Sequence, residues 1–293
     1  MKTLLEYINE SILNEGGNAV KTSNPIPAWV APKVYEEIET AIKKVAPDIK
    51  MAPLGSLGKK KDEDFTGDID IAIEIKTKQE LIEFLEKAFP DVEHVNTKND
   101  IESIGYEYDI EGAKGVAQVD FMVVQNFEWS KFRYSSPDFK KGESKYKGAV
   151  RNALASLIVS AIPVEDMKDE YFEDGVTLKR KYKYTFNAEG VFRQLIDYCG
   201  KNGKPVKSGK KLKEFEKLIT NDPQNCMKFV FGDTATWDDW KSAEDMWRAL
   251  HDPKKFKWQD LVPGIEDRFY NEIEDSVHLK IDFADFPKGK QKD

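Results

Sequence analysis

Apolar residues in the first 161 positions switch between helical and strand spacing. They recur every three to four positions over 32–45 and 78–89, which predicts two helices with one apolar face each. A third helix is predicted from Tyr146 to Ala161. Strands are predicted at 49–56, where the strand runs into a turn, at 69–75, at 103–112 and at 115–125. Glu111-Gly112 marks the turn between the last two strands, and this order predicts a small unit with a mixed sheet.

The pattern changes after Ala161. The segment "EYFEDGVTLKRKYKYTF" predicts a hairpin around Asp174-Gly175. Helical spacing then predicts helices over 189–198, 212–219, 237–250 and 265–274. We therefore expect an α+β protein with three parts, namely an N-terminal helix and linker (1–27), a mixed-sheet domain with flanking helices (28–161) and a mostly helical domain with a hairpin (162–293).

The N-terminal segment predicts a short amphipathic helix followed by a polar linker that reaches Pro27. It lacks the features of a secretory signal. The stretch "MKTLLEYINE" resembles the capsid-targeting peptides of internal head proteins in large tailed bacteriophages. Those peptides are removed by a prohead protease after an apolar-x-Glu site, and cleavage here would follow Glu10 or Glu15. The resemblance implies a place in the phage virion or in the host cytoplasm.

Composition narrows the class of protein. The 293 residues are 40% hydrophobic and 33% charged, without an apolar run of the length that a membrane helix needs. The net charge of −8 argues against general nucleic-acid binding. Residues 131–151 nevertheless carry seven basic and two acidic side chains, which predicts a basic patch near a phosphate site or a solvated loop. The scattered 3 histidines and 2 cysteines argue against a zinc site.

Two aspartates stand in an otherwise apolar strand, "GDIDIAIEI". Side chains alternate along a strand, so Ile69 and Ile71 face the core while Asp68 and Asp70 share the other face. Two neighbouring carboxylates repel each other unless a cation lies between them, and hard divalent ions prefer oxygen ligands. A third acid, Asp120, lies within the strand "GVAQVDFMVV" and is costly to bury without a partner. We therefore expect a shared metal site.

The residues before the aspartates suggest a phosphate loop. Gly55-Ser56 ends a predicted strand, and Gly58 follows two residues later. Glycine allows the main chain to approach a phosphate, which main-chain N–H groups and the Ser56 hydroxyl can bind. Lys59, Lys60 and Lys61 lie in the same loop. They neutralise phosphate charge or form a solvated run, and the sequence leaves both readings open.

The joint pattern resembles the nucleotidyltransferase superfamily typified by DNA polymerase beta, including CCA-adding enzymes and oligoadenylate synthases. The pattern is Gly-Ser, eleven residues, Asp-apolar-Asp and an Asp on a later strand, and the resemblance covers residues 32–160. It implies that Gly55 and Ser56 bind the nucleotide. It also implies that Asp68, Asp70 and Asp120 are catalytic residues that hold two Mg²⁺ ions, with Mn²⁺ as an alternative.

The resemblance further implies transfer of an NMP from an NTP to an acceptor hydroxyl, with release of pyrophosphate. We expect an RNA 3′ end as acceptor, tRNA being one example, and a protein or small molecule is the alternative. A packaged head protein with the fold but without catalysis in the virion is a third hypothesis. Lys147 and Arg151, four residues apart on one helix face, are candidates for binding the triphosphate, with a solvated helix start as the alternative.

Overall fold

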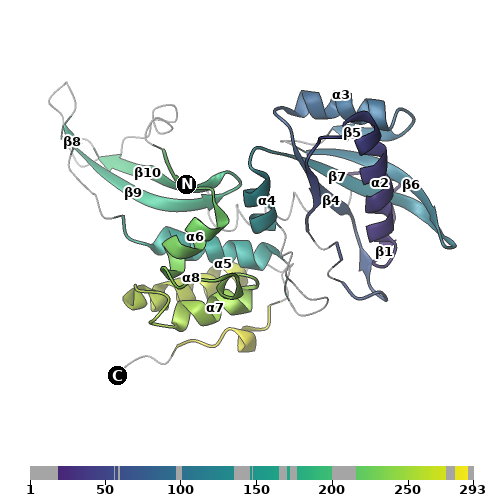
Figure 1. Ribbon diagram of the computed structural model, residues 1–293. Coiled ribbons are helices and arrows are strands. Elements are labelled where there is room, and N and C mark those ends of the chain that lie inside the picture. Colours follow the sequence, from purple (N-terminus) through teal and green to yellow (C-terminus); the bar gives the residue numbers. More distant parts are fainter. Residues whose placement is uncertain are drawn as a thin grey trace. The chain divides into compact units, whose positions relative to one another are not determined.

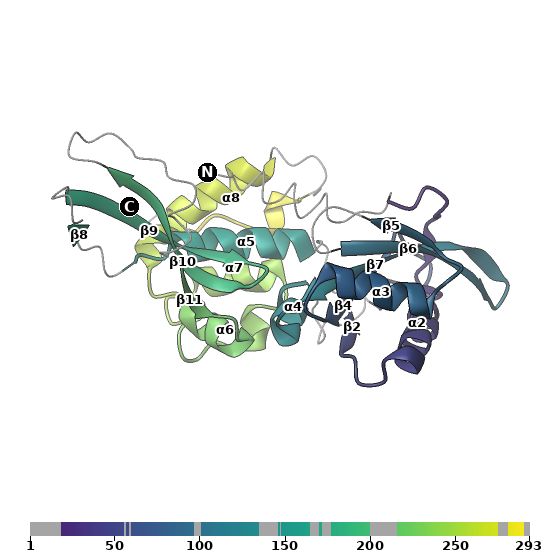
Figure 2. The ribbon, with the colours of Figure 1, turned by 90° about the horizontal axis from the view of Figure 1, so that it is seen from above.

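The computed structural model describes residues 19–55, 57–58, 60–96, 101–134, 146, 148–164, 170–171, 177–199, 216–274 and 281–289. The chain forms two compact units, which divide between Gly148 and Ala149. Among the described residues, the first unit contains a five-stranded sheet, and the second contains four strands and helices α5 to α8 (Figures 1 and 2). The predicted α+β class is confirmed.

The sheet of the first unit is mixed, as predicted, and has the strand order β2-β4-β7-β6-β5. Its strands are β2 (Met51–Pro53), β4 (Ile69–Glu74), β5 (Glu93–Asn96), β6 (Ile101–Ile110) and β7 (Ala113–Val124). β4 and β7 are parallel, whereas the other neighbouring pairs are antiparallel. The turn between β6 and β7 lies at Glu111 and Gly112, both with positive φ (48° and 88°), which matches the twist of a tight hairpin.

Helices α2 (Ala31–Val45) and α3 (Lys78–Ala88) cover one face of this sheet (Figure 1). Both were predicted from their apolar spacing. Their inward residues pack against the isoleucine face of β4 and the alternate residues of β7; the fully buried members include Val34, Ile38, Ile42, Leu81, Leu85, Ile71, Ile73, Val119 and Phe121. Because side chains alternate along a strand, this packing turns Asp70 and Asp120 to the other face.

The face that carries the aspartates has a small apolar cluster of its own. Leu54, Ala72 and Val124 are buried there, and Phe127 and Tyr134 pack against them. Phe127 and Tyr134 are the first and last residues of α4 (Phe127–Tyr134), a short helix that the sequence pattern did not predict. A separate two-stranded pair, β1 (Ile26–Pro27) with β3 (Phe65–Thr66), joins the end of the predicted linker to the loop before β4.

Helix α5 (Gly148–Ala161) corrects the predicted domain boundary. The helix forms as predicted, but from Ala149 onward it belongs to the second unit, so the boundary at 161 lies one helix too late. Nearly all of its residues from Ala149 to Val159 are buried. A helix that is buried on nearly every side is a core helix, so α5 lies inside the second unit.

The predicted helix over 189–198 is wrong, because these residues form β10 (Gly190–Cys199). β10 pairs antiparallel with β9 (Thr177–Asn187) through a tight turn. The Asn187 side chain accepts hydrogen bonds from the main-chain N–H groups of Glu189 (2.9 Å) and Gly190 (3.2 Å). A Cβ on Gly190 would lie 2.7 Å from the Thr220 carbonyl oxygen, so this turn requires glycine. The hydrogen bonds of the Asn187 side chain within the turn and the pairing of β10 with β9 therefore stabilise a strand, although the apolar spacing of these residues weakly favours a helix.

Other parts of the second unit agree only in part with the sequence predictions. β8 (Glu170–Tyr171) pairs antiparallel with β9, as the predicted hairpin requires, while Asp174-Gly175 lies outside the described residues. The predicted helix over 212–219 is wrong at its described end, where β11 (Lys217–Thr220) pairs with β10. Helix α8 (Val262–Glu274) is confirmed, and α6 (Pro223–Phe231) was not predicted. The N-terminal helix that the sequence predicts lies outside the described residues.

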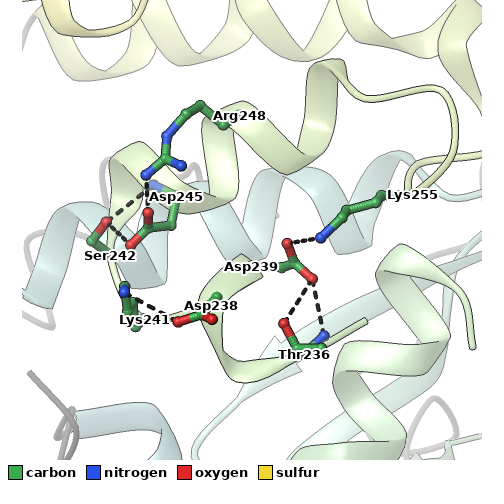
Figure 3. A network of polar contacts seen from close by, with 8 residues as sticks. All are labelled: Thr236, Asp238, Asp239, Lys241, Ser242, Asp245, Arg248 and Lys255. Carbon is green, nitrogen blue, oxygen red and sulfur yellow. Dashed lines mark hydrogen bonds and ion pairs between the residues drawn. The ribbon is translucent and has the colours of Figure 1, made fainter. Parts of the chain in front are cut away.

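The predicted helix over 237–250 is interrupted by a network of caps (Figure 3). A short 3₁₀ segment, η2 (Trp237–Asp239), is closed by Asp239, which accepts from the Thr236 N–H at 2.9 Å. Helix α7 (Ala243–His251) then begins at Ser242, whose hydroxyl accepts from the Asp245 N–H at 3.0 Å. Lys255 pairs with Asp239, and Arg248 pairs with Asp245. Two helix starts six residues apart therefore replace one continuous helix.

Candidate metal centre

The pairing of β4 with β7 brings the three predicted acids together. The parallel register places Asp70 directly opposite Asp120, and Asp68 immediately precedes β4 on the same side as Asp70. One carboxylate oxygen from each of the three aspartates lies within 4.8 Å of the others. The predicted convergence of Asp68, Asp70 and Asp120 is confirmed, and this cluster has the donor chemistry of a divalent metal site.

The three carboxylates differ in their surroundings. Asp120 is buried (2% exposed), whereas Asp68 and Asp70 are half-buried. The pKa of Asp120 is raised to about 6, chiefly because burial disfavours the charged form and also because of the charge of Asp68, while hydrogen bonds from Ser103 and Gln118 oppose the rise. A buried acid beside two others is costly to ionise without a compensating cation. A cation that enters the cluster would therefore favour ionisation of Asp120.

Two polar residues that the sequence did not single out hold the Asp120 carboxylate. Ser103 lies opposite Asp120 on β6, and its hydroxyl donates to Asp120 Oδ1 at 2.6 Å. The Gln118 amide donates to both Asp120 oxygens at 3.0 Å. All three side chains are buried. Gln118 was visible in sequence as the same-face neighbour two residues before Asp120, but Ser103 required the register of β6.

Gly55 stands against Asp70 at the end of the strand that precedes the loop. Its φ is +58°, and a Cβ at this position would lie 2.4 Å from Asp70 Oδ2. Its main-chain N–H donates to the carbonyl oxygen of Tyr134 at 3.1 Å, which ties the turn to the end of α4. Gly55 is thus required both for backbone conformation and for the space that the Asp70 carboxylate occupies.

The structure describes only part of the predicted phosphate loop and of the other candidate nucleotide-binding residues. Ser56, Lys59 and Lys147 lie outside the described residues. Lys60 Nζ donates to the Phe65 carbonyl oxygen at 2.8 Å, and the Lys61 N–H donates to Asp64 at 3.0 Å, so both residues help to close the loop.

Arg151 belongs to the second unit. Its guanidinium is buried there (the residue is 5% exposed), and Nη1 lies 3.5 Å from the carbonyl oxygen of Lys241. Desolvation by this burial lowers the pKa of Arg151 to about 10. The alternative of a solvated helix start is wrong for Arg151, and a contact with triphosphate stays a prediction. One of its contacts is with the main chain of its own unit.

No family model matches the chain, and no curated protein does either. In the described part of the chain, no helix combines the length and the apolar character needed to cross a membrane.

The second unit contains a hollow of about 530 Å³ lined by α7 and the segment 285–289. Its positively charged side chains already contact carboxylates, since Arg248 pairs with Asp245 and Lys288 with Asp267. His251 Nε2 lies 2.8 Å from Glu266 Oε1, and its Nδ1 lies 2.7 Å from the Trp247 carbonyl oxygen. These pairings leave the hollow with little uncompensated positive charge for an anionic ligand, so the acid cluster on β4 and β7 is the stronger candidate site.

Proposed function

We propose that the protein is a metal-dependent nucleotidyltransferase that transfers an NMP from an NTP to an acceptor hydroxyl. The observation that carries the proposal is the convergence of Asp68, Asp70 and Asp120 within 4.8 Å on two parallel neighbouring strands. The glycine turn that abuts Asp70 supports it, because the absence of a Cβ at Gly55 leaves the space in which the Asp70 carboxylate joins the cluster.

The residues fit a pair of divalent cations. Three carboxylates supply only oxygen donors, which Mg²⁺ and Mn²⁺ accept and which two-metal sites share. The two half-buried acids, Asp68 and Asp70, leave an open side for substrate, while Asp120 closes the site from within. When bound, such cations neutralise the charge of a triphosphate and favour deprotonation of the acceptor hydroxyl.

The chain's own residues have distinct parts in this reaction. Asp68, Asp70 and Asp120 would hold the cations, and Ser103 would keep the Asp120 carboxylate oriented through its hydrogen bond of 2.6 Å. The acceptor oxygen forms a bond to the α-phosphorus as the bond to the bridging oxygen breaks. Pyrophosphate then leaves. We assign Asp120 also to assist removal of the acceptor proton, since its carboxylate lies within 4.8 Å of the two other acids that would hold the cations.

The identity of the acceptor follows from charge only in part. The net charge of −8 favours a protein or small molecule, whereas the basic residues between 131 and 151 favour RNA. Of those basic residues, Lys131 lies beside Glu128 and Arg151 is buried, which reduces the positive charge available from the described part of the stretch. We retain an RNA 3′ end as the first candidate and a protein or small molecule as the second.

The test is an incubation of the purified protein with each of four labelled NTPs, together with total RNA and total protein. We expect label to enter one of the two fractions when Mg²⁺ is present. Asp70→Asn preserves side-chain size but removes a ligand charge, and we expect it to lower transfer by at least about 100-fold. Asp109→Asn is the control, because Asp109 is exposed and pairs with Lys114 away from the cluster. Equal transfer by the Asp70 variant and wild type would refute the assignment.

A second proposal concerns where the protein acts. The N-terminal resemblance to capsid-targeting peptides favours packaging in a phage head, with cleavage after Glu10 or Glu15. Mass spectrometry of purified virions should then find the chain beginning at Ser11 or Gly16. Full-length protein confined to the infected-cell cytosol would contradict packaging. Packaging and catalysis are compatible, so this test is independent of the transfer assay.

A further inference from the structure

Gln118 connects the acid cluster to a segment almost one hundred residues earlier in the chain. Its side chain is fully buried. Oε1 accepts hydrogen bonds from the main-chain N–H groups of Ala19, at 2.9 Å, and Val20, at 3.2 Å. Nε2 donates to both carboxylate oxygens of Asp120 at 3.0 Å. One amide group therefore bridges the N-terminal main chain and the innermost acid of the metal centre.

The orientation of this amide is determined by its partners. Main-chain N–H groups only donate, so they require the amide oxygen, and an ionised carboxylate only accepts, so it requires the amide NH₂ group. Rotation of the amide by 180° would place its NH₂ group against the two main-chain N–H groups, which are also donors. It would place its oxygen against the two carboxylate oxygens, which are also acceptors. The N–H groups of Ala19 and Val20 thus select the rotamer that presents donors to Asp120.

The segment 19–24, called here the docking segment, is anchored to the same face of the sheet. Val20 is buried (1% exposed) and lies over Gly105, the residue paired with Gln118 across β6 and β7. A Cβ on Gly105 would lie 2.9 Å from Val20 Cγ1, so this glycine leaves the space that Val20 fills. The Asn24 N–H also donates to the Val116 carbonyl oxygen at 3.0 Å. The docking segment is therefore held by packing and by main-chain hydrogen bonds.

We propose that the docking segment is part of the metal centre and controls its affinity for divalent cations. Its N–H groups fix Gln118, and Gln118, a positioning residue, fixes the carboxylate of Asp120. Residues that orient a metal ligand commonly change affinity by 10- to 100-fold when they are replaced. The inference rests on the proposed role of Asp120 as a metal ligand.

The inference also bears on cleavage near the N-terminus. Cleavage after Glu10 or Glu15 leaves Ala19 and Val20 in the chain, so a trimmed protein would keep its metal centre. Cleavage beyond Val20 would remove both donors to Gln118. The position of a cut would therefore decide whether the site binds metal tightly.

The test measures binding of Mn²⁺, by the loss of the free-ion electron paramagnetic resonance signal, in three shortened or substituted chains. One chain joins Met1 to Gly16 and keeps the docking segment; a second joins Met1 to Ser23 and lacks residues 2–22. The third carries Gln118→Met, which preserves side-chain length and removes all four hydrogen bonds. We expect the chain that begins at Gly16 to bind as wild type does. We expect the other two to bind about 10- to 100-fold more weakly.

Two controls separate positioning from loss of fold. Gln125→Met makes the same chemical change just after β7, where Gln125 is exposed and donates to the Lys76 carbonyl oxygen. We expect this control variant to bind Mn²⁺ within about threefold of wild type. Thermal denaturation of each chain shows whether it is folded at the temperature of the titration, and affinities are compared among folded chains.

Equal Mn²⁺ affinity of the chains beginning at Gly16 and Ser23 would overturn the inference, as would wild-type affinity in Gln118→Met. Wild-type protein that binds Mn²⁺ with the expected differences but transfers no nucleotide would refute the proposed reaction alone. Absence of Mn²⁺ binding in the wild type would overturn both proposals. The metal titration therefore distinguishes failure of the reaction from failure of the positioning role.

Discussion

Replacement of Gly55 by alanine should damage the metal centre through a single methyl group. Gly55 has φ +58°, where an L-residue costs about 1–2 kcal/mol, and its new Cβ would lie 2.4 Å from Asp70 Oδ2. An ordinary contact at such a Cβ begins at 3.4 Å, so the carboxylate must retreat by about 1 Å. Functional side chains tolerate displacement of only about 0.5 Å. We therefore expect Gly55→Ala to lower Mn²⁺ affinity by at least about tenfold.

Gly58→Ala supplies a matched control for this prediction. Gly58 also has positive φ (+71°), but an added Cβ would meet nothing within 4 Å. Both variants should therefore share the backbone penalty of about 1–2 kcal/mol, partly offset by the reduced freedom of the unfolded chain. Only Gly55→Ala should lose Mn²⁺ affinity in a titration without nucleotide, with stability followed by thermal denaturation. Equal losses of affinity in both variants, or wild-type affinity in Gly55→Ala, would refute the steric reasoning.

Three further predictions concern the acids and Arg151. Burial raises the pKa of Asp120 to about 6, so the folded metal-free protein binds the proton more tightly than the unfolded chain, and its stability should fall by up to about 3 kcal/mol as the pH rises from about 4 to about 6. Thermal denaturation across this range should show the fall in wild type, little of it in Asp120→Asn, and recovery with Mg²⁺ above pH 6; the same pH dependence in both proteins would contradict it. Ser103→Ala removes a hydrogen bond that lowers the pKa of Asp120, so Mn²⁺ binding should require a higher pH than in wild type, and an unchanged pH profile would count against this role. Arg151→Lys should lower the thermal midpoint, because the buried site holds a guanidinium, while the KM for NTP stays unchanged; a raised KM with an unchanged midpoint would instead favour the contact with triphosphate.

The first unit agrees closely with the sequence because its elements carry strong periodic patterns. The apolar stripe of α2 and the alternating isoleucines of β4 each permit one arrangement that buries apolar surface, and the structure adopts both. The second unit is less predictable. Residues 190–199 have no decisive period, and their strand conformation depends on pairing with β9 and on the Asn187 turn, which are contacts between segments.

The candidate site also contains residues that the sequence alone identified and residues that only the structure reveals. Asp68, Asp70 and Asp120 were recognisable because ionisable residues are costly on apolar strands, and Gly55 was recognisable because glycine precedes them in a turn. Ser103 and the docking segment carry no such local signal. The spacing of Arg151 beside Lys147 predicted a triphosphate contact or a solvated helix start, and neither prediction places the residue in a helix that is buried on nearly every side.

The sequence by itself determined which face of β4 is apolar and which residues bear charge, because alternation along a strand is a local property of the chain. Only the tertiary structure decided that Asp120 stands opposite Asp70 and that Gln118 connects it to Ala19 and Val20. Strand register and the docking of a distant segment arise from packing between residues far apart in sequence, and periodicity within one segment does not encode them.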